Sequence, residues 1–233
     1  MKTLISPCGS LGFIAIPKNA STSMEAWLSS AGWRQQSIDP SIPYFFLVRD
    51  PVQRLESAIS ECIFQTDLNH NITIESQQKL FESDKIISDI HTLSMVEYLY
   101  NTNLSNKKLI GILMNKHLHI MVNLVLKYHN VNIIDANIPH LNKTEKSPEV
   151  QNLSRFLINQ KYQHFYLGQK IDLKIYEFLD QHTKYHRLEE NYLRAKPKPT
   201  SLNFIIDLLG WQKFLLEILD YTAPKKYNTN DKI

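Results

Sequence analysis

Two short segments near the start of this 233-residue chain each combine an apolar run, a polar turn and a helical pattern. In the first segment, the apolar run over residues 11–16 ends at Pro17, and apolar side chains then recur at helical spacing. In the second, residues 44–48 are apolar without alternation, and Asp50 and Pro51 follow as a typical N-cap and first helical residue. Strands that are apolar on both faces are typical of a parallel sheet covered by helices. The two segments therefore predict an α/β fold.

The middle of the chain predicts further strands and helices. Short strands fit residues 33–38 and 131–134. Residues 93–128 favour helix, although residues 109–114 also fit a strand. A long helix is expected over residues 170–194. Strands that alternate with helices in this way favour a sheet with helices on both faces.

The C-terminal part of the chain is set apart by a lysine- and proline-rich break. Residues 196–199 read Lys-Pro-Lys-Pro and predict a linker, and residues 201–221 predict an apolar amphipathic helix. We therefore expect an α/β domain over residues 1–196 and a C-terminal helical extension over residues 197–233. We expect the 201–221 helix to pack on the domain. The alternative is that it contacts a second copy of the chain, as in a homo-oligomer, or a partner.

Composition and charge argue against several classes of protein. No apolar run reaches the roughly 18 residues that a membrane span needs. The first residues lack the apolar core of a secretory signal, so a cytoplasmic protein without a membrane span is expected. The net charge of +3 is below the strongly basic range that marks dedicated nucleic-acid binders, and no nucleic-acid partner is expected. Cys8 and Cys62 form neither a disulfide framework nor a CxxC motif.

The first turn carries residue types that bind anions. Lys18 supplies a mobile positive charge, and Ser21, Thr22 and Ser23 supply hydroxyl donors where a helix begins. The unpaired N–H groups of a helix N-terminus also attract negative charge. A P-loop does similar work, but its Gly-x4-Gly-Lys-Ser/Thr pattern is absent here. The alternative is a capping box, in which Thr22 and Glu25 serve only the start of the helix.

The second turn places two arginines beside a helix start. Arg49 stands where the strand ends, and Arg54, Ser57 and Ser60 are spaced to share one face of the helix that follows. Arginine can bind a phosphate through two parallel hydrogen bonds. The alternative is that either arginine pairs with a nearby carboxylate at the surface, and Arg54 in particular fits a structural role.

Both turns resemble motifs of one enzyme family. Residues 17–23, Pro-Lys-Asn-Ala-Ser-Thr-Ser, resemble the 5′-phosphosulfate loop of sulfotransferases that use 3′-phosphoadenosine 5′-phosphosulfate (PAPS). Residues 48–57 resemble the 3′-phosphate motif of that family, and most closely that of its carbohydrate branch, Arg-Asp-Pro-x-x-Arg-x-x-Ser. The clear resemblance covers about residues 11–63, and weaker similarity follows at residues 117–119 and 139–144.

The resemblance implies a role for each turn. Contacts to the 5′-phosphosulfate would come from Lys18, Asn19, Ala20, Ser21, Thr22 and Ser23. Arg49 and Ser57 would bind the 3′-phosphate. An acceptor hydroxyl would attack sulfur in line, while Lys18 and the helix N–H groups stabilise negative charge on the oxygen that bridges to the departing phosphate. No metal is expected, because lysine and arginine supply the positive charge.

The base that removes the acceptor's proton stays open at this point. Some members of the family carry a histidine or an acidic residue between the two motifs, but residues 24–48 contain no histidine here. His117 is the first candidate, because it begins the weakly similar segment. His119, His140 and Glu56 are the alternatives.

The sequence as a whole predicts a P-loop-like parallel sheet flanked by helices, with a C-terminal helical extension. The predicted function is transfer of a sulfuryl group from PAPS to a hydroxyl-bearing acceptor, for which the resemblance implies a carbohydrate, with 3′-phosphoadenosine 5′-phosphate (PAP) as product. Two other classes stay open. One is a P-loop-type nucleotide or sugar kinase, against which the missing Gly-Lys-Ser/Thr motif counts. The other is a non-catalytic relative that binds a nucleotide or a partner.

Overall fold

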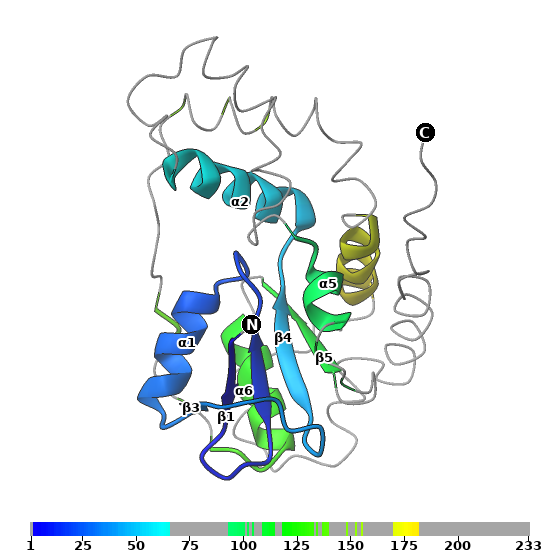
Figure 1. The fold of residues 1–233 in the computed structure, drawn as a ribbon. Coiled ribbons are helices and arrows are strands. Elements are labelled where there is room, and N and C mark those ends of the chain that lie inside the picture. Colours follow the sequence, from blue (N-terminus) through cyan, green and yellow to red (C-terminus); the bar gives the residue numbers. More distant parts are fainter. Residues whose placement is uncertain are drawn as a thin grey trace, which may run out of the picture.

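The computed structural model of the chain is organised around one mixed β-sheet (Figure 1). The strands lie in the order β3-β1-β2-β4-β5. Their bounds are β1 (Lys2–Ile5), β2 (Gly12–Ala15), β3 (Arg34–Gln35), β4 (Tyr44–Val48) and β5 (Leu109–Leu113). The structure describes residues 2–65, 93–100, 102, 104, 109–114, 118–132, 134, 137–139, 148, 152, 155 and 170–181; side chains are not described at 62–65 and 100.

The parallel part of the sheet consists of β2, β4 and β5. β4 pairs in parallel with β2 on one side and with β5 on the other. All three strands are buried along their whole length, which accounts for their apolar sequences without alternation. The strands predicted within residues 11–16 and 44–48 are confirmed. Over residues 109–114 the structure shows the strand rather than the helix.

The antiparallel part of the sheet corrects the expectation of a purely parallel arrangement. β1 pairs antiparallel with both β2 and β3, so the sheet is mixed. A tight turn joins β1 to β2: Ser6 N donates to Leu11 O at 2.9 Å, and Gly9 has a φ of 71°. Glycine adopts this left-handed conformation at little steric cost. β3 is also shorter than the strand expected over residues 33–38.

The helix α1 (Ser21–Ser30) follows β2 as predicted. Its buried side chains include Met24, Trp27 and Leu28, the residues whose spacing indicated a helix. Gly32, just beyond the helix, has a φ of 86° and stops it.

The helix α2 (Pro51–Gln65) follows β4, also as predicted. Its N-cap is Asp50, whose Oδ1 accepts a hydrogen bond from Gln53 N at 3.0 Å. Leu55 and Ile59 are buried against the rest of the domain. Val52, in the first turn of the same helix, is 45% exposed.

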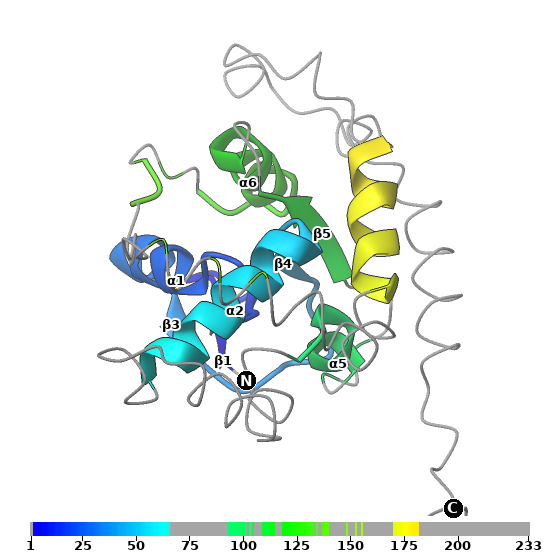
Figure 2. The same ribbon diagram turned by 90° about the horizontal axis from the view of Figure 1, so that it is seen from above.

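Helices cover both faces of the sheet (Figure 2). α6 (Leu118–Tyr128) lies on the same side as α1, where the rings of Trp27 and His119 are 5.9 Å apart between centroids. α5 (Met95–Tyr100) and the helix over residues 170–181 lie on the other side. The fold is therefore an α/β sheet with helices on both faces.

The segment after α6 differs from its prediction. Residues 131, 132 and 134 do not form a strand, although Val131 and Ile134 are buried. Asn123 of α6 accounts for the backbone there: its Oδ1 accepts from Ile134 N at 3.0 Å and its Nδ2 donates to Ile134 O at 3.2 Å. A side-chain amide therefore satisfies the polar groups that a neighbouring strand would otherwise pair.

Other predicted elements lie outside the described residues. These are the 182–194 part of the long helix, the 201–221 helix and the whole 197–233 extension. In the described part of the chain, no helix has the length and apolar character needed to cross a membrane.

Candidate functional site

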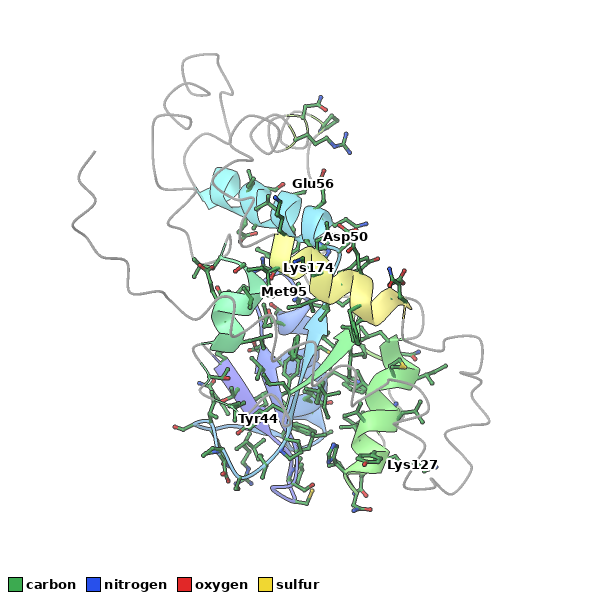
Figure 3. All side chains as sticks on the ribbon, turned by 90° about the vertical axis from the view of Figure 1, so that its right-hand side faces the viewer. Tyr44, Asp50, Glu56, Met95, Lys127 and Lys174 are labelled. Carbon is green, nitrogen blue, oxygen red and sulfur yellow. The ribbon has the colours of Figure 1, made fainter. Side chains whose placement is uncertain are left out.

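The two predicted turns meet at one end of the sheet. β2 and β4 are parallel neighbours, so the turn after Ala15 and the turn after Val48 lie at the same carboxyl edge. α2 passes above this edge (Figure 1). Asp50 lies at this end of the molecule, whereas Tyr44 and Lys127 lie toward the other end (Figure 3). In open α/β sheets, the carboxyl edge is where ligands bind.

The turn over residues 17–20 has an uncommon backbone conformation. Lys18 and Ala20 have positive φ angles of 65° and 52°. This left-handed conformation costs about 1 kcal/mol or more for a residue other than glycine, and such residues cluster at functional sites. A left-handed residue followed by helical residues directs successive N–H groups toward one side and forms a concave anion-binding surface. The 17–20 turn therefore has the backbone of an anion-binding loop built without glycine.

The helix α1 begins at this turn without a side-chain cap. Ala20 is the N-cap residue, no side chain caps the helix, and its first turn contains no acidic residue. The capping box considered for Thr22 and Glu25 is therefore not formed. Ser21 is half-buried, Thr22 is exposed and Ser23 is buried. The hydroxyl groups of Ser21 and Thr22 are thus within reach of a ligand at a helix end that attracts negative charge.

The N-terminus of α2 differs from that of α1 at the same edge. The Asp50 carboxylate already accepts the N–H of Gln53 there. Because a negative group occupies this helix end, a second anion is disfavoured at it. The α1 terminus is therefore the better helix end for an anion.

Asn19 fixes the 17–20 turn to its surroundings. Its side chain is 1% exposed. Its Nδ2 donates to Leu47 O at 2.7 Å and lies 3.0 Å from the sulfur of Met95, while its backbone N donates to Ile16 O at 3.2 Å. The side-chain amide of Asn19 thus attaches the turn to β4 and α5, and its backbone N–H closes the turn onto Ile16. Among the described residues, its Oδ1 has no hydrogen-bond partner.

Arg54 supports the same turn from below α2. The residue is 2% exposed. Its Nε donates to Pro17 O at 3.3 Å and its Nη2 donates to Leu93 O at 2.6 Å. Its Nη1 lies 3.9 Å from Oδ2 of Asp172, which is also buried. Burial lowers the pKa of Arg54, and the negative charge of Asp172 opposes this shift. Arg54 therefore has a structural role, and its partner is a carboxylate from a distant part of the chain.

Asp172 connects Arg54 to the start of α5. Its Oδ2 accepts from Met95 N at 2.7 Å and its Oδ1 accepts from Val96 N at 3.1 Å. Burial raises the pKa of Asp172 to about 6, against the opposing effects of Arg54 and the two N–H groups. The helix over residues 170–181 is thereby linked to α5 and, through Arg54, to the carbonyl of Pro17.

Arg49 has very different surroundings from Arg54. Its side chain is half-buried, and its Nη1 donates to Lys18 O at 3.3 Å. Burial lowers the pKa of Arg49, and Asp50 and Glu56 oppose this shift. Among the described residues this is the single hydrogen bond of its guanidinium, so most of its five N–H donors have no protein acceptor there. Arg49 therefore retains the capacity to bind a phosphate.

Lys18 and α2 meet across the 17–20 turn. The Lys18 ammonium Nζ lies 3.1 Å from Oε2 of Glu61, and these side chains are 17% and 34% exposed. Arg54 and Glu61, two helical turns apart on α2, both reach the turn. Ser57 lies between them on the same stripe of the helix and is half-buried.

Of the candidates for a catalytic base, the described residues include His119 and Glu56, and both contact other protein groups. His117 and His140 lie outside the described residues. His119 is engaged within the fold: its Nε2 is 3.2 Å from Ile134 O and 3.0 Å from Asn123 Nδ2. Glu56 forms an ion pair with Arg155, with 3.5 Å between Oε1 and Nε.

Two site residues were missed by the sequence analysis. Glu61 carried a usable signal, because it follows Ser57 by one helical turn and so shares the face that was predicted for Arg54 and Ser57. Asp172 carried none, since its contacts with Met95 and Arg54 join residues far apart in the sequence.

Comparisons with known proteins add no relative to this geometry. No family model, no curated protein and no solved structure matches the chain. The residues of the site are therefore the basis for inferring a function.

Proposed function

We propose that this protein is a PAPS-dependent sulfotransferase of P-loop-like topology that sulfates a hydroxyl group, with a carbohydrate as the acceptor. The observation that carries the proposal is the pairing of two anion sites on adjacent parallel strands. One is the uncapped start of α1 with the left-handed residues Lys18 and Ala20. The other is Arg49, whose guanidinium contacts the first turn through Lys18 O and keeps most of its donors unused among the described residues.

A ligand with two separated phosphate-like groups fits this pairing. The 5′-phosphosulfate would bind the N–H groups of the turn, with Lys18, Ser21 and Thr22 beside it. The 3′-phosphate would bind Arg49, with Ser57 as a second donor. The arrangement favours PAPS over a nucleotide whose phosphates form one chain, because such a chain needs one long anion site rather than two.

The proposed reaction is an in-line displacement at sulfur. A bond forms between the acceptor oxygen and sulfur, while the bond between sulfur and the bridging oxygen breaks and its electron pair leaves with PAP. Lys18 and the N–H groups of the turn stabilise the charge that grows on the bridging oxygen. The acceptor's proton passes to a base, for which His117 stays the first candidate. Lysine and arginine supply the positive charge, so the proposal requires no metal.

The location of the protein and contact between its copies are inferred from the sequence alone. We expect a cytoplasmic enzyme, and contact between copies of the chain through the C-terminal extension stays an expectation.

Calorimetric titration with PAP and with ATP tests the function. The proposal expects micromolar binding of PAP that is at least tenfold tighter than that of ATP. Arg49→Ala should weaken PAP binding at least tenfold, since a hydrogen bond to a charged group contributes about 1.5–3 kcal/mol. Arg34→Ala is the matched control, because Arg34 is exposed and pairs with Ile5 of β1, at the end of the sheet away from the site.

Two results would overturn the proposal. One is equal or tighter binding of ATP, above all with magnesium-dependent turnover, which would support a kinase. The other is an absence of binding by either nucleotide, which would support a protein that acts through a partner.

A further inference from the structure

The ammonium group of Lys18 is occupied by an acidic residue of the protein itself. Its Nζ lies 3.1 Å from the carboxylate of Glu61, at the turn where the proposed 5′-phosphosulfate would bind. Lys18 is 17% exposed and Glu61 is 34% exposed, so the pair lies at the rim of the site and both side chains can be reached by solvent. The ion pair therefore has the position of a contact that a bound anion would have to replace or share.

We propose that Glu61 is an internal competitor for Lys18, which lowers the affinity of the turn for the 5′ group of the nucleotide. This inference rests on the proposed function, because it assumes that Lys18 contacts that group. In the free protein, the carboxylate pairs with the ammonium. When the ligand binds, Lys18 transfers its contact to the 5′ group, and Glu61 then lies near a second negative charge.

Electrostatics predicts that affinity for the ligand rises when Glu61 loses its charge. Removing the charge of Glu61 frees Lys18 before binding and also removes repulsion between the carboxylate and the ligand. Partly exposed pairs of this kind are weak, and the repulsion acts through solvent. The two effects together amount to about a three- to tenfold change in affinity. After transfer of the sulfuryl group, the same competition would favour release of PAP, because Glu61 recaptures Lys18.

The competition should act on one end of the ligand. Glu61 pairs with Lys18 at the first turn, whereas Arg49 at the second turn is assigned to the 3′-phosphate. A nucleotide that carries only the 3′-phosphate should therefore be insensitive to Glu61. This separates competition for Lys18 from a general change in the charge of the protein.

The test compares Glu61→Gln with the wild-type protein by calorimetric titration at low ionic strength. PAP should bind the variant about three- to tenfold more tightly. Binding of 3′-AMP, which has no 5′-phosphate, should change by less than about twofold. Added salt should narrow the gap in PAP affinity, because it screens a partly exposed pair.

The matched control is Glu25→Gln. Glu25 forms a similar ion pair with Lys2, with 3.2 Å between Oε2 and Nζ, but that pair does not contain Lys18. The Glu25→Gln substitution changes the net charge by the same amount as Glu61→Gln and should alter PAP binding by less than about twofold.

The outcomes separate this inference from the proposed function. If the wild-type protein binds PAP and Glu61→Gln binds it no more tightly, the proposed competition is wrong, whereas the proposed function still stands. The competition is also wrong if 3′-AMP gains as much affinity as PAP. If the wild-type protein binds neither PAP nor inorganic pyrophosphate, both proposals fail together.

Discussion

Arg49 and Arg54 belong to one short motif and have opposite surroundings. Arg54 is 2% exposed and contacts Pro17 O, Leu93 O and Asp172. Arg49 is half-buried and, among the described residues, makes one hydrogen bond, to Lys18 O. Both arginines thus bind carbonyl oxygens of the same turn. Arg54 also contacts Leu93 O and Asp172, whereas Arg49 has no further protein acceptor among the described residues.

The difference shows how one residue type can serve the fold and the ligand in the same motif. The carbonyls of Pro17 and Lys18 point toward the two arginines. These contacts help to maintain the left-handed backbone, whose N–H groups are then presented to an anion. Arg54 stabilises this geometry from inside the protein, whereas Arg49 both supports it and keeps donors for a ligand.

The largest expected effect is on stability in Arg54→Ala. Loss of this side chain leaves Asp172 without its cation and two carbonyls without a donor in the interior. Removing one member of a buried ion pair typically costs about 3–5 kcal/mol. Urea unfolding at pH 7 should show this loss for Arg54→Ala and less than about 1 kcal/mol for Arg49→Ala. Equal losses in the two variants would remove the distinction between the arginines.

Arg54→Lys keeps the comparison testable if the alanine variant does not fold. Lysine retains the charge but lacks the planar fork that reaches three acceptors. It should lose less stability than Arg54→Ala. A lysine variant as stable as the wild-type protein would show that charge alone matters.

The next effect is a pH dependence that comes from Asp172. Burial raises the pKa of this carboxyl to about 6 in the folded protein, compared with about 3.9 in the unfolded chain. Between these values the folded protein retains a proton that the unfolded chain releases. The contribution of Asp172 to stability is therefore fully present below about pH 4 and is lost as the pH rises through 6.

Asp172→Asn isolates this contribution, because the amide does not titrate. The free energy of unfolding of the wild-type protein, minus that of the variant, should fall by up to about 3 kcal/mol between pH 4 and pH 7. Other carboxyl groups are common to both proteins and cancel in the difference. A difference that rises with pH would mean that the pKa of Asp172 is lowered in the folded protein. The attraction of Arg54 would then outweigh the effect of burial.

The smallest effect concerns the turn that both arginines contact. Ala20 has a φ of 52° and a ψ of 27°, so Ala20→Gly relieves a left-handed conformation that alanine disfavours. The free energy of unfolding should rise by about 0.5–1 kcal/mol. Ala26→Gly, at an exposed position within α1, should lower it by about 1 kcal/mol. If both variants are destabilised equally, Ala20 is not strained in solution.

The sequence predicted the parts of the fold that depend on local pattern. The apolar runs of β2 and β4 and the spacing of Met24, Trp27 and Leu28 were enough to place two strand-turn-helix units. The Asp50-Pro51 pair marked the start of α2 correctly. The hairpin of β1 and β2 was not predicted, because Leu4 and Ile5 form too short an apolar run to indicate a strand when the partner strand is unknown.

The candidate site was likewise predictable only where it depends on local sequence pattern and on the pairing of neighbouring strands. Lys18, Ser21, Thr22 and Arg49 lie at one edge, because neighbouring parallel strands bring their turns together. The buried state of Arg54 was not predictable, since it depends on Asp172 at a distant position. The occupation of Lys18 by Glu61 likewise depends on how α2 crosses the turn. Contacts made across the chain, rather than the spacing within a motif, decide which cations are left for a ligand.

Discrimination between PAP and 5′-AMP is the sharpest test of the two-site assignment. The two nucleotides differ in the 3′-phosphate, the proposed ligand of Arg49, whereas their 5′-phosphates would meet the same turn. The wild-type protein should bind PAP at least tenfold more tightly than 5′-AMP, since a charged hydrogen bond contributes about 1.5–3 kcal/mol. In Arg49→Ala this preference should shrink to about threefold or less, with 5′-AMP binding nearly unchanged. An Arg49→Ala protein that keeps the full preference for PAP would show that Arg49 does not bind the 3′-phosphate.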